Sequence, residues 1–488
     1  MENIIETPLS PIDHAAPRHY CAFRFYLPLN SGVTPESSFK VLHEGLHRTF
    51  VQLPWLSGQT WDQDPDAKDY RPGQLVIRHH PVHLAGAWPS QLTFRQFDAG
   101  ETFDELREEG FPTDALPDSQ PEWISSPPDV GKGPNVFKAQ ACFIPGGCIL
   151  LAGPQHLVCD GTAAVSIVNL WAEHCRAIQL QSNVSVVGPL PAASDRSLLA
   201  AACKTHGPKD SPDFTSWRLF GRSGPPPPVP ETEAGRAPPA PLTEVPMRSA
   251  IFYIPADRFA LLYKNSMDTG SPGVSSMDAL SALVWRSTLR ARHNVAFQDP
   301  HNKSDVGKEG AWAAVAIMLD GRGQLESDLL LSGYLGNLTC VNLALMPLAQ
   351  LTSPETSLAS IARLIREGAA GVNPKTLMDA YALADTLPDF NRLKYTDMPL
   401  DGTALQISPL LSLPASSLNF GGWLFGNDGC PEALRPPMNW FNQSTRTCFF
   451  LPKLSGGGVE VVLNLFEQEM DILLEDPEFL EYAVHLAD

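Results

Sequence analysis

The sequence has few charged residues, and basic residues are the scarcer kind. Charged side chains make up 18% of the 488 residues, and the formal net charge is −19. Nucleic acids and anionic lipids attract basic surfaces, so this balance argues against both as main partners. It leaves room for a small anionic ligand, because a local basic pocket can exist on an acidic protein.

Paired cysteines and long apolar runs are also missing. The nine cysteines are scattered, odd in number and without a C-x-x-C pair, which predicts reduced thiols inside a cell. No apolar run approaches the roughly 20 residues that span a bilayer, and the opening MENIIETPLS lacks the features of a signal peptide. We therefore expect a cytoplasmic monomer that has no membrane anchor.

The distribution of proline and of apolar residues predicts two lobes. An apolar content of 43% is typical of a globular protein, and 488 residues exceed one ordinary core. Residues 205–247 are rich in proline and lack hydrophobic periodicity, as in a crossover between domains. We predict an N-terminal lobe over residues 1–204 and a C-terminal lobe over residues 248–488.

Strands and helices interleave in both predicted lobes, so the fold class is α/β. The expected strands cover residues 20–27, 75–78, 136–143, 149–152, 249–254, 313–319, 338–345 and 458–465. The expected helices cover residues 35–50, 160–178, 257–263, 275–292, 357–370 and 476–486.

One histidine lies between a predicted strand and a predicted helix. Residues 149–152 form a short apolar run, preceded by a Gly-Gly turn. Asp160 stands where a helix N-cap belongs, and apolar residues then recur at three- and four-residue steps. His156 is thereby held on a rigid mount that suits a general base. From these residues alone, a general base and a buried histidine bonded to the backbone stay equally open.

Two other His/Asp pairs have the same spacing. His206 and Asp210 lie in the proline-rich stretch, and His301 and Asp305 lie in a polar stretch. Neither pair is flanked by a strand and a helix, so we interpret both as accidental.

A competing motif, His43-Glu44-Gly45-Leu46-His47, matches the HExxH zinc motif of metalloproteases. No third histidine stands in the metzincin position, no glutamate follows in the next stretch, and the glycine weakens the predicted helix. We therefore favour a helix edge over a zinc site and expect no metal. The histidines at positions 79, 80 and 83 are interpreted as solvated, because neighbours on a strand point to opposite faces.

The residues HLVCDG around His156 resemble the HxxxDG motif of the BAHD acyltransferases, which share a fold with chloramphenicol acetyltransferase and carnitine acyltransferases. Further matches are LSPIDHAAPRHY, LPWLSGQ, VFKAQACFIPGGCILLAGPQHLVCDG, MDALSALVWR, DGRGQ and GYLGN. Near the C-terminus, LNFGGWLFGNDGCPEALRPP replaces the family's DFGWG, with Asn419 in the Asp position and Trp423 displaced by one. This form resembles the fungal branch that includes trichothecene 3-O-acetyltransferases.

The resemblance implies a two-lobed chloramphenicol-acetyltransferase-like fold, in which each lobe is a mixed β-sheet flanked by helices. A tunnel would run between the lobes, with His156 near its middle. Acyl-CoA, most often acetyl-CoA in the family, would enter from one face. A small secondary metabolite would enter from the other and present a hydroxyl, or less commonly an amine. His156 would remove its proton within a ternary complex.

The resemblance also implies architectural roles near this base. Asp160 would cap the helix and hold the loop, and Gly161 would let the backbone approach closely. Asn337 and Gly421 occupy family-motif positions and are expected to be architectural.

The family's C-terminal Asp pairs with an Arg, which would be Arg322 here. Asn419 would then leave a neutral hydrogen bond at most. Arg392 and Lys394 are available to meet the phosphates of CoA, although no motif marks them.

Three alternatives remain open. A relative with this fold would catalyse a condensation or rearrangement, using His156 to generate a carbanion. A second alternative is a protein that binds a metabolite without transfer. The third is a zinc hydrolase using His43, Glu44 and His47.

Overall fold

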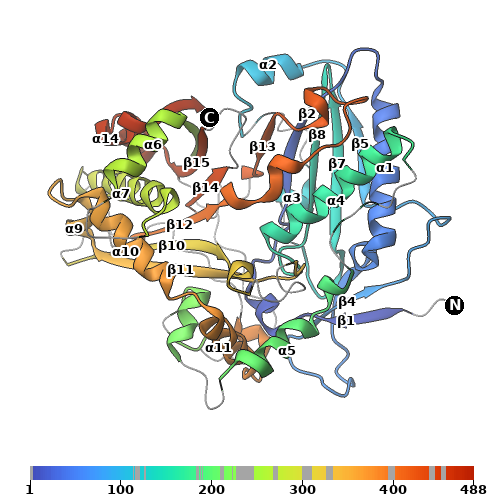
Figure 1. The fold of residues 1–488 in the computed structure, drawn as a ribbon, viewed down its shortest axis with the longest axis horizontal. Coiled ribbons are helices and arrows are strands. Elements are labelled where there is room, and N and C mark those ends of the chain that lie inside the picture. Colours follow the sequence, from blue (N-terminus) through green and yellow to red (C-terminus); the bar gives the residue numbers. More distant parts are fainter. Residues whose placement is uncertain are drawn as a thin grey trace.

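The computed structural model of the chain describes residues 4–113, 115, 121–125, 128–182, 186, 188, 191–208, 214–222, 224–226, 247–267, 273–298, 310–325, 333–393, 402–438, 446–451 and 458–488. Figure 1 shows two groups of strands side by side, each with helices on its outer face. None of the described helices combines the length and apolar character needed to cross a bilayer.

The first half of the chain builds a mixed five-stranded sheet in the order β13-β2-β8-β7-β5. Its strands are β2 (Phe23–Pro28), β5 (Leu92–Gln96), β7 (Phe137–Ile144), β8 (Gly147–Pro154) and β13 (Ala433–Arg435). β7 and β8 form the predicted hairpin, and Gly146 turns it with a φ of 85° that favours glycine. β5 pairs with β7 in parallel, whereas the other pairs are antiparallel.

Two helices pack together against this sheet, α1 (Pro35–Gln52) and α4 (Gly161–Gln179) (Figure 1). The indole Nε1 of Trp171 donates to the carbonyl of Leu42 at 2.7 Å. A Cβ at Gly45 would collide with Cys175, so this glycine permits the close contact between the helices. Both predicted helices are confirmed.

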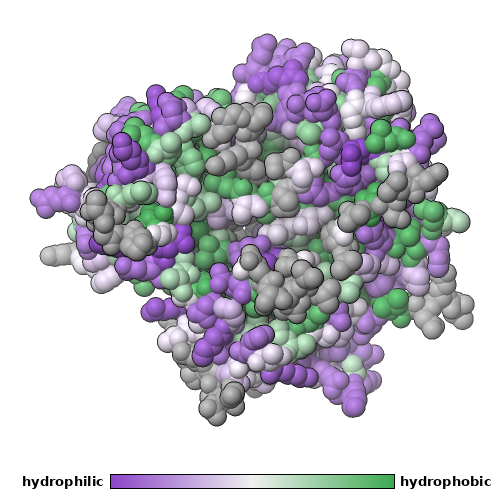
Figure 2. Space-filling view, viewed as in Figure 1, coloured by the Kyte–Doolittle hydropathy of each residue, from purple (hydrophilic) through white to green (hydrophobic). Residues whose placement is uncertain are grey.

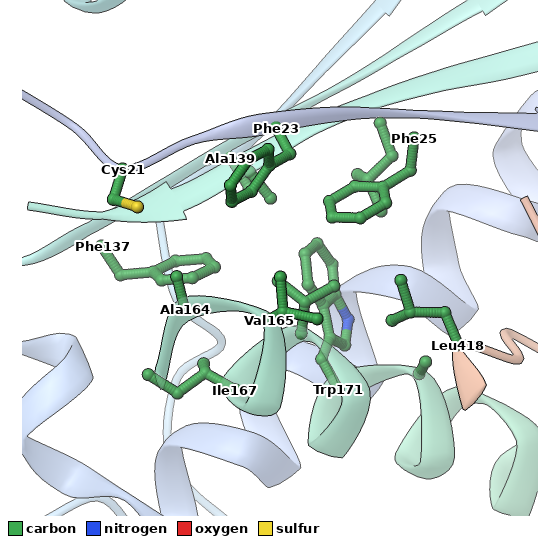
Figure 3. Packing of buried hydrophobic residues seen from close by; sticks show 14 of the residues in the cluster. Cys21, Phe23, Phe25, Phe137, Ala139, Ala164, Val165, Ile167, Trp171 and Leu418 are labelled. Carbon is green, nitrogen blue, oxygen red and sulfur yellow. The ribbon is translucent and has the colours of Figure 1, made fainter. Parts of the chain in front are cut away.

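Aromatic and aliphatic side chains fill the space between this sheet and α4. Figure 3 shows Phe23 and Phe25 of β2 facing Val165 and Trp171 of α4. All four side chains are buried. The apolar stripe read from the sequence is therefore the face of α4 that anchors the loop before it.

The second half of the chain builds a mixed seven-stranded sheet in the order β11-β10-β12-β14-β15-β9-β16. Its strands are β9 (Met247–Ile254), β10 (Trp312–Asp320), β11 (Thr339–Pro347), β12 (Ala404–Pro409), β14 (Thr447–Leu451), β15 (Val459–Phe466) and β16 (Val484–Ala487). The helices on its outer side are α6 (Ala256–Asn265), α7 (Ser276–Gln298), α9 (Leu348–Thr352), α10 (Leu358–Ala370), α13 (Glu467–Leu473) and α14 (Pro477–Tyr482).

Smaller elements complete the architecture. A four-stranded sheet contains β1 (Ile5–Pro8), β4 (Leu75–His79), β3 (Gln59–Asp62) and β6 (Lys132–Asn135). The remaining helices are α2 (Phe103–Glu108), α3 (Glu122–Ser125), α5 (Ser197–His206) and α11 (Pro374–Asp385). Short 3₁₀ helices include η1 (Pro11–Ala15), η5 (Phe214–Phe220) and η8 (Gly321–Leu325).

The α/β fold class is confirmed, and several details differ from the sequence prediction. The closing helix expected over residues 476–486 ends at Tyr482, because the following residues pair with β9 as β16. β13 joins the first sheet although it comes from the second half, and the buried Arg435–Glu460 pair (2.6 Å) joins it to β15. Much of the predicted crossover lies outside the described residues, and its described part includes η5. The lobe boundaries themselves stay a prediction.

Candidate active site

His156 lies in the loop between β8 and α4, on the wall of a large cavity. Its backbone N–H donates to the carbonyl of His19 at 2.8 Å, which fixes the loop against the N-terminal segment. The rings of His19 and His156 meet edge to face, with centroids 5.5 Å apart. The imidazole is partly exposed, and its exposed surface belongs to the cavity.

The cavity has a volume of about 1290 Å³ and is enclosed by both halves of the chain. The N-terminal segment before β2 supplies one wall, and α11 with the ends of β10, β11 and β12 supplies the opposite one. Most of the lining side chains are apolar. On the face seen in Figure 2, hydrophobic residues gather in the hollow between the two halves, whereas the outer edges are mainly hydrophilic. A cavity of this size accommodates more than one small molecule.

The surroundings of His156 keep its imidazole neutral. Burial lowers the pKa of His156 below its ordinary value, and its own backbone, the Asp160 carboxylate and the Asn337 side chain oppose that effect only in part. A neutral imidazole has a lone pair that can accept a proton at neutral pH. The arrangement therefore places a neutral imidazole, which is able to accept a proton, beside an apolar cavity.

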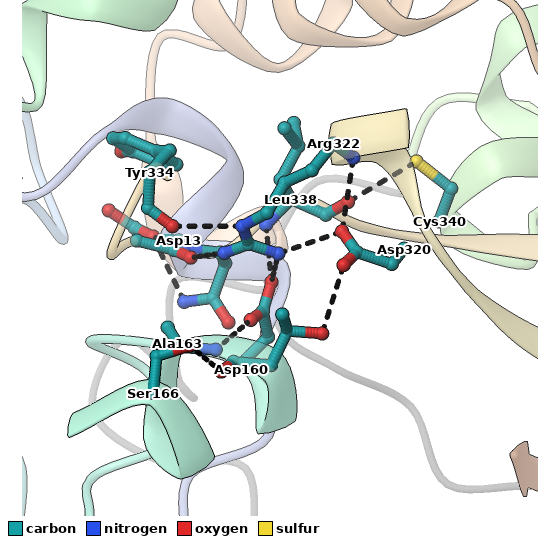
Figure 4. Close-up of polar contacts among 12 residues, drawn as sticks. Asp13, Asp160, Ala163, Ser166, Asp320, Arg322, Tyr334, Leu338 and Cys340 are labelled. Atoms are coloured by element: carbon teal, nitrogen blue, oxygen red, sulfur yellow. Dashed lines mark hydrogen bonds and ion pairs between the residues drawn. The ribbon is translucent and has the colours of Figure 1, made fainter. Parts of the chain in front are cut away.

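Asp160 is buried, does not line the cavity and belongs to a polar network of its own (Figure 4). Its Oδ1 accepts from the N–H of Ala163 at 3.1 Å and caps α4. Its Oδ2 accepts from Arg322 Nη1 at 2.9 Å and from the N–H of Leu338 at 2.8 Å. Burial works against the charged form, but the Arg322 guanidinium and these N–H groups hold the pKa of Asp160 below its usual range. Asp160 therefore joins the two halves as a permanent anion.

Arg322 spreads this connection over the C-terminal half. It pairs with Asp320 at 2.8 Å and donates to the carbonyls of Tyr334 and Gly336. Figure 4 shows the guanidinium between the two carboxylates. The guanidinium of Arg322 therefore donates to two carboxylates and two backbone carbonyls. Because these hydrogen bonds are charge-assisted, they hold the network rigidly.

A second buried carboxylate, Asp13, positions Asn337. Asp13 Oδ1 accepts from Asn337 Nδ2 at 2.9 Å, and its Oδ2 lies 3.4 Å from Arg196 Nη1. Asn337 Nδ2 also donates to the carbonyl of Leu157 at 3.1 Å. Its Oδ1 and the Nδ1 of His156 are both buried and lack a hydrogen-bond partner among the described residues. Asn337 is therefore held with its carbonyl oxygen available beside the imidazole.

Comparison with known proteins identifies the family. A family model named "Transferase family" matches residues 129–480, and the "Trichothecene 3-O-acetyltransferase-like N-terminal domain" matches residues 20–175. The chain belongs to the Transferase family. The predicted acyltransferase family and enzyme class are thereby confirmed.

Two of its sequence relatives are fungal proteins. The chain is 28% identical, over 97% of its length, to the isocyanide synthase-NRPS hybrid crmA of Aspergillus fumigatus, but it spans only 31% of that protein. It is 25% identical to eremophilane O-acetyltransferase ORF8 of Penicillium roqueforti, over 98% of both chains. The structure of F. sporotrichioides TRI101 complexed with coenzyme A and T-2 has the same fold, with a TM-score of 0.76 at 20% identity, over 99% of this chain and 100% of that one.

The structure corrects the partner expected for Arg322. Its guanidinium bonds Asp160 and Asp320, whereas Asn419 donates to the carbonyl of Asp428 and accepts from the N–H of Gly421. The Asn419 substitution in this Transferase-family chain therefore changes a local turn and leaves the Arg322 network intact. The reason is that Asp160, the N-cap of α4 in the first half of the chain, already accepts a hydrogen bond from this guanidinium.

The other C-terminal motif positions surround the end of α4. Gly421 has a φ of 102°, and a Cβ there would collide with the Gln179 side chain. Gln179 Oε1 accepts from the N–H of Leu424 at 3.1 Å, which fastens this loop to the helix. Trp423 is 72% exposed and does not line the cavity. Gly421 and Trp423 therefore belong to the architecture of this loop.

Gly161 opens α4 and lines the cavity. Apart from its chain neighbours and the nearby backbone of α4, no described protein atom lies within 4 Å of the point where its Cβ would stand. The close approach expected at this glycine is therefore not to another part of the protein, and the space beside it belongs to the cavity.

The HExxH residues each have a different partner. His43 Nε2 bonds the carbonyl of Pro89 at 2.6 Å, and His47 Nε2 bonds that of Leu84 at 3.1 Å. Glu44 pairs with Arg48 at 2.6 Å. In the part of the chain that the structure describes, no three His, Cys, Asp or Glu side chains are grouped as metal ligands. The geometry thus gives no support to the zinc-hydrolase alternative.

The remaining expectations have separate outcomes. Arg392 does not line the cavity and donates to the carbonyl of Pro226 at 2.6 Å, so it is not free to meet CoA. Lys394 lies outside the described residues, as do Asp210 and the pair at positions 301 and 305. His206 ends α5.

Sequence reasoning missed several residues at the site. Asp13, Arg18 and His19 all lie in LSPIDHAAPRHY, which was read only as a family signature. That segment contacts His156 through the backbone and the ring of His19. The sequence feature that could have marked them is the cluster of Asp13, His14, Arg18 and His19 within residues 13–19.

Proposed function

We propose that this protein transfers an acyl group, acetyl foremost, from acyl-CoA to a hydroxyl of a small fungal secondary metabolite, with His156 as the general base. The observation that carries the proposal is a neutral histidine on the wall of a cavity enclosed by both halves. The O-acetyltransferase among the full-length relatives supports the reaction class. The CoA complex of the TRI101 relative supports the donor.

The proposed step follows from the geometry of the imidazole. Nε2 of His156 takes the proton of the acceptor hydroxyl while its oxygen attacks the thioester carbonyl. The tetrahedral intermediate collapses, the C–S bond breaks, and the CoA sulfur receives the proton from the imidazolium. No acyl-enzyme forms, because the cavity holds donor and acceptor together.

Asn337 positions the base in this scheme. Its Oδ1 and Nδ1 of His156 are two buried atoms without another partner among the described residues, and a hydrogen bond from Nδ1–H to Oδ1 would select the tautomer with a lone pair on Nε2. Asp13 and the Leu157 carbonyl hold the amide in that orientation. Asp160 takes no part in proton transfer, because Arg322 and two backbone N–H groups occupy its carboxylate.

A condensation reaction is the second candidate, favoured by the relationship to a hybrid protein that contains an NRPS. In that case His156 would act on a donor held by a carrier protein and not on acyl-CoA. The same cavity and base would serve both reactions, so products must distinguish them.

The test measures thiol release from acetyl-CoA in the presence of extract metabolites, followed by mass spectrometry of the products. We expect release with the wild type, addition of one acetyl group to an alcohol, and neither with His156→Ala. Wild-type turnover in His156→Ala would overturn the assignment of the base. A product joined by a new C–C or peptide bond would favour condensation.

A further inference from the structure

Among the described residues of the cavity wall, Arg18 is a buried cation without an ion-pair partner. Nε and Nη2 of Arg18 are buried, and Arg18 makes no hydrogen bond or ion pair with any residue that the structure describes. Burial lowers the pKa of this guanidinium, which the Asp62 charge opposes without forming an ion pair. An unpaired buried charge is costly, so such a group calls for a ligand.

The other cavity-lining groups do not substitute for Arg18. Burial lowers the pKa of His19 to about 4, and His156 is neutral for the same reason. Lys132 lies on the wall too, but its side chain is 71% exposed and pairs with Asp129 at 3.1 Å. Among the described lining residues, Arg18 is therefore the one buried positive charge at neutral pH.

The position of Arg18 identifies which substrate meets it. Arg18 precedes His19, whose ring touches that of His156. The phosphates of CoA are separated from its thioester by the whole pantetheine arm. Arg18 and His19 are adjacent residues of the same cavity wall, so with the thioester at His156 an acceptor is within better reach of Arg18 than those phosphates.

We infer that Arg18 binds an anionic group of the acceptor, most readily a carboxylate, so that the acceptor is an apolar hydroxy acid. The inference rests on the proposed function for the identity of the reacting centre. A guanidinium binds a carboxylate through two parallel hydrogen bonds, and the apolar lining receives the rest of the molecule. Binding of the acid would also satisfy the donors that are otherwise unpartnered.

Two fluorescent probes of nearly the same shape test the anion site without any turnover. 8-Anilinonaphthalene-1-sulfonate carries an anion, and N-phenyl-1-naphthylamine is its neutral counterpart. Arg18→Met should weaken binding of the sulfonate about tenfold or more and leave the neutral probe unchanged. Lys132→Met is the matched control and should change neither probe by more than about twofold. Asp62→Asn should strengthen sulfonate binding.

Stability and turnover complete the test. Arg18→Met should melt at the same temperature as the wild type or higher, because it removes an unpaired buried charge. With acetyl-CoA as donor, 6-hydroxy-2-naphthoate should exceed its methyl ester in kcat/KM by about tenfold, and Arg18→Met should abolish that preference.

Three results would overturn the inference. The first is that Arg18→Met weakens binding of both probes equally, and the second is that it weakens binding of neither. The third is that Arg18→Met raises only the KM for acetyl-CoA. If no thiol is released while sulfonate binding still depends on Arg18, the anion site stands and the proposed function fails.

Discussion

Two histidine motifs lie on neighbouring elements of this protein and have opposite surroundings. In HExxH on α1, His43 and His47 direct Nε2 at backbone carbonyls, and Glu44 pairs with Arg48. In HxxxDG before α4, His156 faces a cavity, while the aspartate four residues later is fully occupied elsewhere. The HExxH motif is the rarer pattern by chance, yet its histidines are used for packing. Spacing selects candidates, but partners and access to a cavity decide which residue can do chemistry.

Loss of His156 should have the largest effect on activity. His156→Ala is expected to lower kcat/KM by about 10³-fold, because a general base contributes roughly 10²–10⁴. The unfolding free energy should change little, since part of the imidazole surface faces the cavity and not the core. His47→Gln is the matched control on α1 and should retain activity. Equal losses in the two variants would break the comparison between the motifs.

Loss of Asp160 should act mainly on stability. Asp160→Ala leaves Arg322 with one carboxylate partner and uncaps α4, so urea unfolding should show a loss of about 3 kcal/mol. Activity should fall with it, because the loop of His156 is no longer held.

Arg322→Met in the same chain offers the control. If the two groups act through each other, the double variant should be less destabilised than the sum of the singles by about 1 kcal/mol or more. A lower rate with unchanged unfolding would contradict the architectural role and indicate that the carboxylate takes part in the chemistry.

The pH dependence should distinguish Asn337 from a merely structural residue. Protonation removes the base, so kcat/KM should rise with pH through a pKa below 6.5 and then stay level, because burial lowers the pKa of His156. The Asn337 side chain raises that pKa, so Asn337→Ala should move the acid limb to lower pH and reduce the plateau about tenfold. Asn337→Asp is a second variant. Its negative charge would favour the imidazolium of His156, so the acid limb of the kcat/KM profile should move to higher pH. An unshifted limb in both would refute the positioning role.

The smallest effect is expected at Glu44. Glu44→Gln removes an ion pair that is partly exposed, worth about 0.3–0.5 kcal/mol on a helix. Activity should stay within about twofold of the wild type. A loss of activity restored by added zinc would reopen the hydrolase alternative.

The elements with local signals could be predicted from the sequence. α1, the β7–β8 hairpin and α4 have clear periodicity, a glycine turn and an N-cap, and all were expected. β16 was not, because residues 484–487 become a strand only through pairing with β9, far away in the sequence. The same holds for β13, which crosses to the first sheet.

The site was predictable where a motif marked it and not where distant segments meet. His156 and its mount followed from the residues around them. The partner of Arg322 did not, because it depends on the contact between α4 and η8, which come from different halves. Asp13 has no spacing signature, and it meets Asn337, far along the chain, only in the folded protein.

The most direct test of the account follows labelled acetyl groups from acetyl-CoA into the metabolites of a fungal extract, with wild-type and His156→Ala protein compared side by side. The account predicts a labelled acetate ester of an alcohol with the wild type and no labelled product with His156→Ala. Both proteins should bind CoA and unfold at the same urea concentration. Label transferred equally by a folded His156→Ala protein would contradict it.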